Sequence, residues 1–140
     1  MDMLNVTIDG VKVSVPAGTT VLEAARKANI HIPTLCYLKD INQIGACRMC
    51  VVDVGARALA AACVMPVSEG MVVKTNTPAV RAARKSVLEL ILSNHKRECL
   101  SCVRSQNCEL QKLAVELGAD ETRFEGSNIE YPLDAISPSM

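Results

Sequence analysis

The opening residues alternate between apolar and polar positions and then change to a helical period. Residues 4–15 (LNVTIDGVKVSV) form two alternating runs separated by Asp9 and Gly10. An Asp-Gly pair between such runs favours a β-hairpin, because both central residues of a type I′ turn need positive φ. Thr20, with Glu23 three residues later, forms a capping-box pattern before VLEAARKA and predicts a short helix. The order strand, strand, helix predicts the opening of a β-grasp domain.

The pattern changes twice after this opening. Periodicity is absent between residues 31 and 50, and a loop of this length without regular structure is usually functional. Strand character returns over residues 51–54 and 71–75, with Cys63 between the two segments. We therefore expect a long functional loop to be inserted between the first helix and two further strands.

A helical pattern begins at Thr77, an N-cap residue followed by proline, and should end near Asn94. Its apolar positions recur at helical spacing: Val80, Ala83, Val87 and Ile91. Charged positions are expected to occupy the other face: Arg81, Arg84, Lys85 and Glu89. A second, shorter helix is predicted from just after Cys108 to about Leu117, where Gly118 can stop it.

Composition narrows the class of protein. The 140 residues suffice for one domain, or for one compact domain with an appendage, and 49% of them are hydrophobic. Fifteen basic side chains balance fifteen acidic ones and aromatic residues are scarce, so neither nucleic acid nor membrane insertion is expected. The N-terminus has no signal-peptide pattern, and no apolar stretch is long enough to span a bilayer. An odd number of cysteines without an export signal favours the cytoplasm.

All seven cysteines and one histidine fall into two sets of four metal-binding side chains. The first set has the spacing C-x10-C-x2-C-x12-C and consists of Cys36, Cys47, Cys50 and Cys63. Four thiolates are what a [2Fe–2S] cluster takes. Gly45 and Ala46 precede the second cysteine and remove side-chain bulk, so their amides can donate hydrogen bonds to cluster sulfur. A structural zinc site is the alternative, although zinc sites usually offer two C-x2-C-like pairs and this set has one.

The second set follows the predicted long helix and has the spacing H-x3-C-x2-C-x5-C. Its members are His95, Cys99, Cys102 and Cys108. Taken alone, one histidine and three cysteines suit structural zinc about as well as an iron–sulfur cluster. A neighbouring redox site favours a [4Fe–4S] cluster, because an electron carrier gains from a second centre nearby. Neutral imidazole in place of one thiolate removes negative charge, so His95 should raise the cluster's potential.

Three segments carry a resemblance to a known family. LCYLKDINQIGACRMCVVDV, AACVMPVSEGMVV and NHKRECLSCVRSQNCELQ resemble the N-terminal region of a group of redox subunits. The group comprises catalytic subunits of NAD(P)-linked, often electron-bifurcating [FeFe]-hydrogenases, related NAD-dependent formate dehydrogenase subunits, and the large iron–sulfur subunit of respiratory complex I. The resemblance covers essentially the whole chain. The tail and the short x12 gap before Cys63 favour the hydrogenase branch.

The resemblance implies an α+β fold in three parts. Residues 1–77 would form a β-grasp [2Fe–2S] domain of ferredoxin type, ligated by the four cysteines of the first set. Residues 78–118 would form a helical [4Fe–4S] segment ligated by His95 and the three cysteines of the second set. Residues 119–140 would form a linker to domains that this chain does not contain. The chain is then either an excised fragment of a larger subunit or a small free-standing relative, and the unpacked tail favours the fragment.

The resulting hypothesis is an electron-transfer module that relays single electrons through two clusters. No residue is assigned a catalytic role, and no G-x-G-x-x-G motif for a nicotinamide is present. The expected partners are the flavin- and NAD(P)-binding and iron–sulfur subunits of a hydrogenase complex. One group of basic side chains is a candidate docking surface: Arg81, Arg84, Lys85, Lys96, Arg97 and Arg104. The rival class is a zinc-stabilised interaction module, while a thiol oxidoreductase would need a βαβ context that is missing here.

Overall fold

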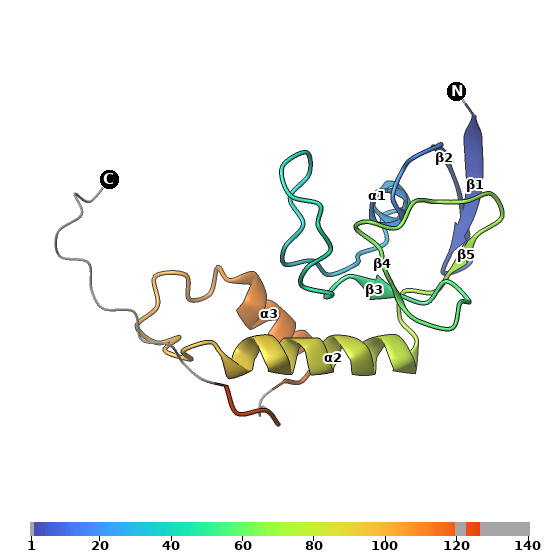
Figure 1. Ribbon diagram of the computed structural model, residues 1–140. Coiled ribbons are helices and arrows are strands. Elements are labelled where there is room, and N and C mark those ends of the chain that lie inside the picture. Colours follow the sequence, from blue (N-terminus) through green and yellow to red (C-terminus); the bar gives the residue numbers. More distant parts are fainter. Residues whose placement is uncertain (1, 120–122, 127–140) are drawn as a thin grey trace.

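The computed structural model describes residues 2–119 and 123–126 of the chain. Figure 1 shows a small β-rich unit at the N-terminal end and two helices beside it. The elements in chain order are β1 (Met3–Ile8), β2 (Val11–Pro16), α1 (Val21–Lys27), β3 (Val51–Val52), β4 (Ala60–Ala61), β5 (Val72–Val73), α2 (Pro78–Ser93) and α3 (Glu109–Glu116). The α+β class predicted from the sequence is confirmed. The linker predicted over residues 119–140 lies mostly outside the described residues.

The three-stranded sheet has the order β2-β1-β5, with β1 and β2 antiparallel and β1 and β5 parallel. The predicted hairpin is confirmed, because Asp9 (φ 48°) and Gly10 (φ 85°) both have positive φ at its turn. Thr20 caps α1 as predicted, accepting a hydrogen bond from the Glu23 amide. Alternation in β1 buries Val6 and Ile8 against α1, which contributes Leu22 to the same apolar core.

A second, two-stranded sheet was not expected from the sequence. β3 and β4 pair in antiparallel fashion, with Val51 opposite Ala61 and Val52 opposite Ala60. Sequence reasoning predicted a strand over residues 51–54 but found no signal in residues 60–61, because two alanines have no strand preference. The pairing depends on the tertiary arrangement of the chain around them.

α2 begins where the sequence predicted, with Thr77 accepting a hydrogen bond from the Val80 amide at 3.2 Å, and its C-cap is Asn94. α3 also matches its predicted bounds, and Gly118 follows it with a φ of 61°. The expected division of α2 into an apolar and a charged face is wrong. Arg84 and Glu89 are only 6% and 2% exposed, so both lie on the buried side of the helix.

The physical reason is the position of the packed stripe along α2. Residues four apart lie on one face of a helix, and the fully buried stripe is Val80, Arg84 and Leu88. A charged residue therefore occupies a central core position, and sequence periodicity assigned it to the outer face by residue type. Glu89 is buried beside this stripe, where the Arg123 guanidinium lies 2.7 Å from its carboxylate.

The helices share a second apolar cluster with the loop that precedes β3. Its buried members are Met49, Leu88, Leu92, Leu113 and Ala119. Met49 belongs to the long irregular loop, so its side chain helps to join the β-rich part of the molecule to both helices. The two parts of the chain are consequently packed against each other through a common core.

Candidate metal centres

The two-stranded sheet positions two of the first set of cysteines. Cys50 directly precedes β3 and Cys63 follows β4, and the Ala62 amide donates to the Cys50 carbonyl at 3.2 Å. Because the strands are antiparallel, this pairing brings both cysteines to the same end of the sheet. Both are only 1% exposed. The sheet thus fixes half of the predicted ligand set in the interior.

The other two cysteines come from the irregular loop and reach the same place. Burial, a hydrogen bond with Cys50 and the charges of Cys50, Cys36 and Cys47 together raise the pKa of the Cys63 thiol to about 12. The thiols of Cys36, Cys47 and Cys50 are thus close enough to Cys63 for their charges to act on its ionisation. The structure brings together the four residues that the sequence spacing grouped.

Backbone amides point at the thiols of this set. The Cys47 amide donates to Cys36 Sγ at 3.5 Å, and the Met49 amide donates to Cys47 Sγ at 3.4 Å. Burial opposes ionisation of Cys47, but hydrogen bonds from the backbone of Met49, Cys36 and Leu35 outweigh it and lower the pKa of the thiol. Hydrogen bonds of this kind favour thiolates, which are the form that binds metal.

The two residues predicted to leave room for a cluster differ in their surroundings. Gly45 is buried with a φ of 63°, and a Cβ built on it would lie 3.2 Å from a methyl carbon of Val64. Ala46 is exposed. Gly45 therefore lets the loop approach the segment that carries Cys63, and glycine is needed both for the space and for the backbone conformation.

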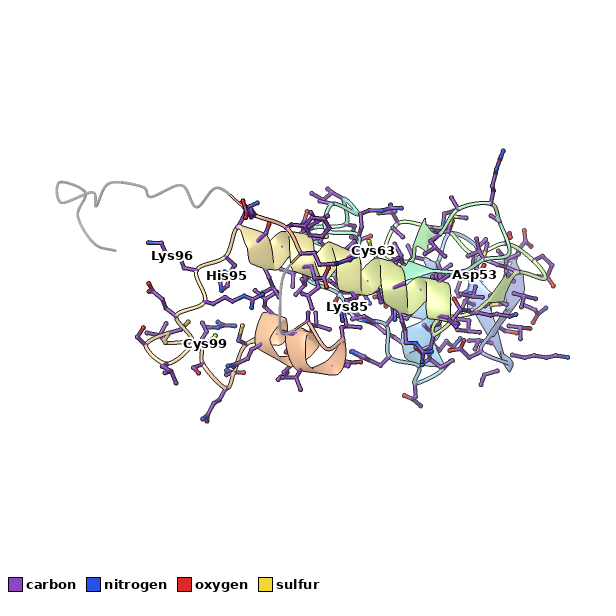
Figure 2. The ribbon with its side chains drawn as sticks, turned by 90° about the horizontal axis from the view of Figure 1, so that it is seen from below. Asp53, Cys63, Lys85, His95, Lys96 and Cys99 are labelled. Carbon is purple, nitrogen blue, oxygen red and sulfur yellow. The ribbon has the colours of Figure 1, made fainter. Side chains whose placement is uncertain are left out.

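The second set lies at the ends of the two helices. His95 follows the C-cap of α2, and Cys108 is the N-cap residue of α3 with no hydrogen bond from its side chain to the helix. All four members of the set line one cavity of about 160 Å³, which is far more than the roughly 10–15 Å³ that one water molecule requires. Figure 2 shows His95 and Cys99 beyond the C-terminal end of α2, whereas Cys63 lies further back along the helix.

Burial distinguishes the two sets. Cys99 and Cys102 are exposed and Cys108 is partly buried, whereas two thiols of the first set are fully buried. The positive end of the α3 dipole faces Cys108 and favours an anionic group at that point. The second set can therefore hold a charged metal group at the surface of the molecule.

Each set offers three or four thiols as metal donors. Within residues 2–119 and 123–126, no three His, Cys, Asp or Glu side chains are placed to hold a single metal ion. A zinc ion would need its four donors about 2.0–2.3 Å from one point. Iron–sulfur clusters distribute such thiolate ligands over two or four iron atoms, so the thiol-rich chemistry of both sets fits clusters.

The sequence pattern did not predict the burial of two residues near the first set. The pattern assigned Met49 no role beyond the irregular loop. In the structure its amide donates to Cys47 Sγ, and its side chain is buried in the helical core. The sequence predicted Arg84 on the exposed face of the helix, but its Nη2 donates to the Val51 carbonyl at 2.8 Å. A signal for Arg84 was its position four residues after Val80 and four before Leu88, within an otherwise apolar stripe.

These features define an iron–sulfur protein of ferredoxin type with a second metal-binding segment. Residues 1–78 match the family described as 2Fe-2S iron-sulfur cluster binding domain, and residues 84–123 match the NADH-ubiquinone oxidoreductase-G iron-sulfur binding region. The chain belongs to the 2Fe-2S iron-sulfur cluster binding domain family. It carries one [2Fe–2S] and one [4Fe–4S] cluster, the cofactors predicted from the sequence.

Similar proteins are subunits of larger redox enzymes. The NADP-reducing hydrogenase subunit HndD of Solidesulfovibrio fructosivorans is 47% identical over the whole of this chain, which spans 25% of that protein. The NADH-ubiquinone oxidoreductase 75 kDa subunit of Reclinomonas americana is 42% identical over 87% of the chain and 18% of that protein. The chain thus spans about a quarter or less of the length of these relatives.

A solved structure is similar along nearly the whole chain. The crystal structure of an NAD+-reducing [NiFe]-hydrogenase in the H2-reduced state matches 96% of this chain and 57% of its own, with a TM-score of 0.87 and 31% identity. The resemblance predicted from the sequence is therefore confirmed: the chain is an iron–sulfur electron-transfer region of the kind found in hydrogenases and complex I-type oxidoreductases.

Proposed function

We propose that this chain relays single electrons between a buried [2Fe–2S] cluster and a surface [4Fe–4S] cluster within a hydrogenase subunit. The observation that carries the proposal is the convergence of four thiols around Cys63, next to a helical segment whose four donors line one cavity. When bound, iron–sulfur clusters accept and release electrons one at a time.

The ligand assignment follows the two sets. Cys36, Cys47, Cys50 and Cys63 would hold the [2Fe–2S] cluster, and His95, Cys99, Cys102 and Cys108 would hold the [4Fe–4S] cluster. Amides of the loop, those of Gly45 and Ala46 included, would donate to sulfur and tune the potential. Met49, fully buried in the helical core, connects the loop of the first set to the helices that carry the second.

The parent enzyme we favour is an NAD(P)-linked [FeFe]-hydrogenase of the electron-bifurcating type. Identity to the NADP-reducing hydrogenase subunit extends over the whole chain, whereas identity to the 75 kDa subunit of the NADH-ubiquinone oxidoreductase covers 87% of it. The partners would be flavin- and NAD(P)-binding and iron–sulfur subunits. The equivalent region of a formate dehydrogenase or of complex I is the alternative parent.

The location that suits this role is the cytoplasm. All seven cysteines are free thiols, and thiols persist as metal ligands where the compartment is reducing. No helix among the described residues is both long and apolar enough to cross a membrane.

The proposal is tested by measuring iron, acid-labile sulfide and zinc per chain after anaerobic reconstitution, with EPR spectra recorded after dithionite reduction. About six iron and six sulfide per chain with two reduced signals are expected, because a [2Fe–2S] and a [4Fe–4S] cluster together hold that number. Cys63→Ser should weaken only the [2Fe–2S] signal, and Cys99→Ser only the other. Stoichiometric zinc without iron would refute electron transfer.

A further inference from the structure

One charged side chain lies in the interior between the helices and the first metal site. Arg84 is 6% exposed and occupies the buried stripe of α2 between Val80 and Leu88. Its Nη2 donates to the carbonyl of Val51, the first residue of β3 and the neighbour of Cys50. Figure 1 shows α2 running beneath β3, and the hydrogen bond to Val51 places the guanidinium at the strand that directly follows this cysteine.

The guanidinium is poorly compensated by the protein. Nε of Arg84 is buried and has no hydrogen-bond partner among the described residues. Arginine stays charged in proteins, so the cation is held where its solvation is weak. Burying a charge without a matching partner is costly, and such a group persists where an anion completes its surroundings.

The negative charge that acts most strongly on Arg84 belongs to the first cysteine set. Burial lowers the pKa of Arg84, and the charges that oppose this effect are those of Cys50, then Glu116 and Asp9. Asp9 is already engaged, since its carboxylate accepts hydrogen bonds from the amide and hydroxyl of Thr75. Among the negative charges that act on the guanidinium, that of Cys50 has the largest effect.

We propose that Arg84 is a built-in counter-charge that raises the reduction potential of the [2Fe–2S] cluster. The inference rests on the proposed assignment of Cys50 as a ligand. A cluster held by four thiolates carries net negative charge, and reduction adds one more. A fixed cation nearby stabilises the reduced form more than the oxidised form, and the low dielectric of the interior strengthens the effect.

The test compares a variant without the charge of Arg84 with a variant that keeps it. Arg84→Gln removes the charge and shortens the side chain, whereas Arg84→Lys keeps the charge. Lys85→Gln removes an exposed charge one residue further along α2 and is the matched control. Both clusters are titrated by EPR in the reconstituted 140-residue chain, and the [4Fe–4S] signal serves as an internal reference.

Arg84→Gln should lower the equilibrium constant for reduction of the [2Fe–2S] cluster by about tenfold, about 59 mV for a one-electron couple. Arg84→Lys should stay within a few-fold of wild type, and Lys85→Gln should have little effect. The [4Fe–4S] potential should change least in every variant. An unchanged [2Fe–2S] potential in Arg84→Gln, or equal shifts in Arg84→Gln and Lys85→Gln, would overturn the inference.

The free energy of unfolding of the metal-free chain and the assembly of the cluster in each variant provide a second test. In the metal-free chain Arg84→Gln should leave the free energy of unfolding unchanged or raise it, because the cation lacks its counter-charge there. If Arg84→Gln does not assemble the cluster, Arg84→Lys decides: a wild-type potential supports the counter-charge, and a shifted potential or a missing cluster rejects it. A wild-type chain without a [2Fe–2S] signal, or one that keeps this signal in Cys63→Ser, would remove the ligand assignment as well.

Discussion

The environments of the two cysteine sets differ most at the level of single residues. Cys50 and Cys63 are 1% exposed, whereas Cys99 and Cys102 are exposed to solvent. Reduction adds negative charge, which an apolar interior solvates poorly, so burial alone would lower the potential of the first site. Amides that donate to sulfur and the buried Arg84 act in the opposite direction.

His95 offers a direct test of the second ligand set. His95→Cys should still assemble a [4Fe–4S] cluster, since the residue lines the same cavity as the three cysteines. A fourth thiolate adds negative charge, so the potential should fall by roughly 100 mV or more, in the direction opposite to that of histidine in Rieske centres. EPR-monitored redox titration measures the shift. An unchanged potential would remove His95 from the ligand set.

Gly45 tests whether close approach of the loop matters for the first site. Gly45→Ala should destabilise the chain by about 2–3 kcal/mol, because alanine is strained at positive φ and its Cβ would press on Val64. Gly55→Ala is the control, with a similar φ of 74° and nothing within 4 Å of the added Cβ, and should cost only about 1 kcal/mol. Denaturant unfolding measures both. Equal losses in the two variants would show that the contact with Val64 is unimportant.

At the level of elements, α2 is held from both sides. Its N-terminal half packs on β3, and the short segment of residues 123–126 lies along its other end. Arg123 donates to the carboxylate of Glu89 and to the hydroxyl of Ser86, and a Cβ on Gly126 would overlap the Ser93 carbonyl oxygen. The segment after α3 therefore contacts α2 closely at several points.

The pair formed by Arg123 and Glu89 can be measured by a double-mutant cycle. Arg123→Ala should destabilise the chain by about 1–3 kcal/mol, because it leaves a carboxylate that is 2% exposed without its cation. In the Glu89→Gln background the same change should cost much less. Thermal or denaturant unfolding of the four proteins gives the coupling free energy. Additive effects would mean that the ion pair contributes nothing to stability.

On the scale of the whole molecule, one shared core sets how the two metal sites lie relative to each other. Met49 from the loop of the first site is packed with Leu88, Leu92 and Leu113 of the helices. Dense packing of this kind resists small displacements, so the two sites form parts of one body. A relay benefits from this rigidity because electron transfer depends on a constant separation between donor and acceptor.

Removing the metals tests how the fold divides into metal-dependent and metal-independent parts. In the chelator-treated chain we expect residues 36–50 and 95–108 to lose amide protection, because thiolate ligation is what fixes these loops. The hairpin of β1 and β2 should keep its protection, since it is held by its own ladder and by the core around Ile8. Hydrogen exchange of the loaded and metal-free chains measures the difference. Protection in both loops without metal would contradict this division.

The sequence by itself determined the local features and the metal chemistry. Positive φ at Asp9 and Gly10, the caps at Thr20 and Thr77, and the grouping of cysteines into two sets all follow from short-range rules or from spacing. Such features depend on neighbours in the chain, so they can be recognised without the fold.

The contacts between segments far apart in the sequence were decided by the tertiary structure alone. The β3–β4 pairing, the insertion of Met49 into the helical core and the burial of Arg84 and Glu89 each join residues far apart in the sequence. Periodicity assigns a charged side chain to the surface because burying a charge is costly, and it cannot anticipate a partner supplied by another element. The sequence places Arg84 in line with Val80 and Leu88, but only the folded chain supplies the Val51 carbonyl that its guanidinium contacts.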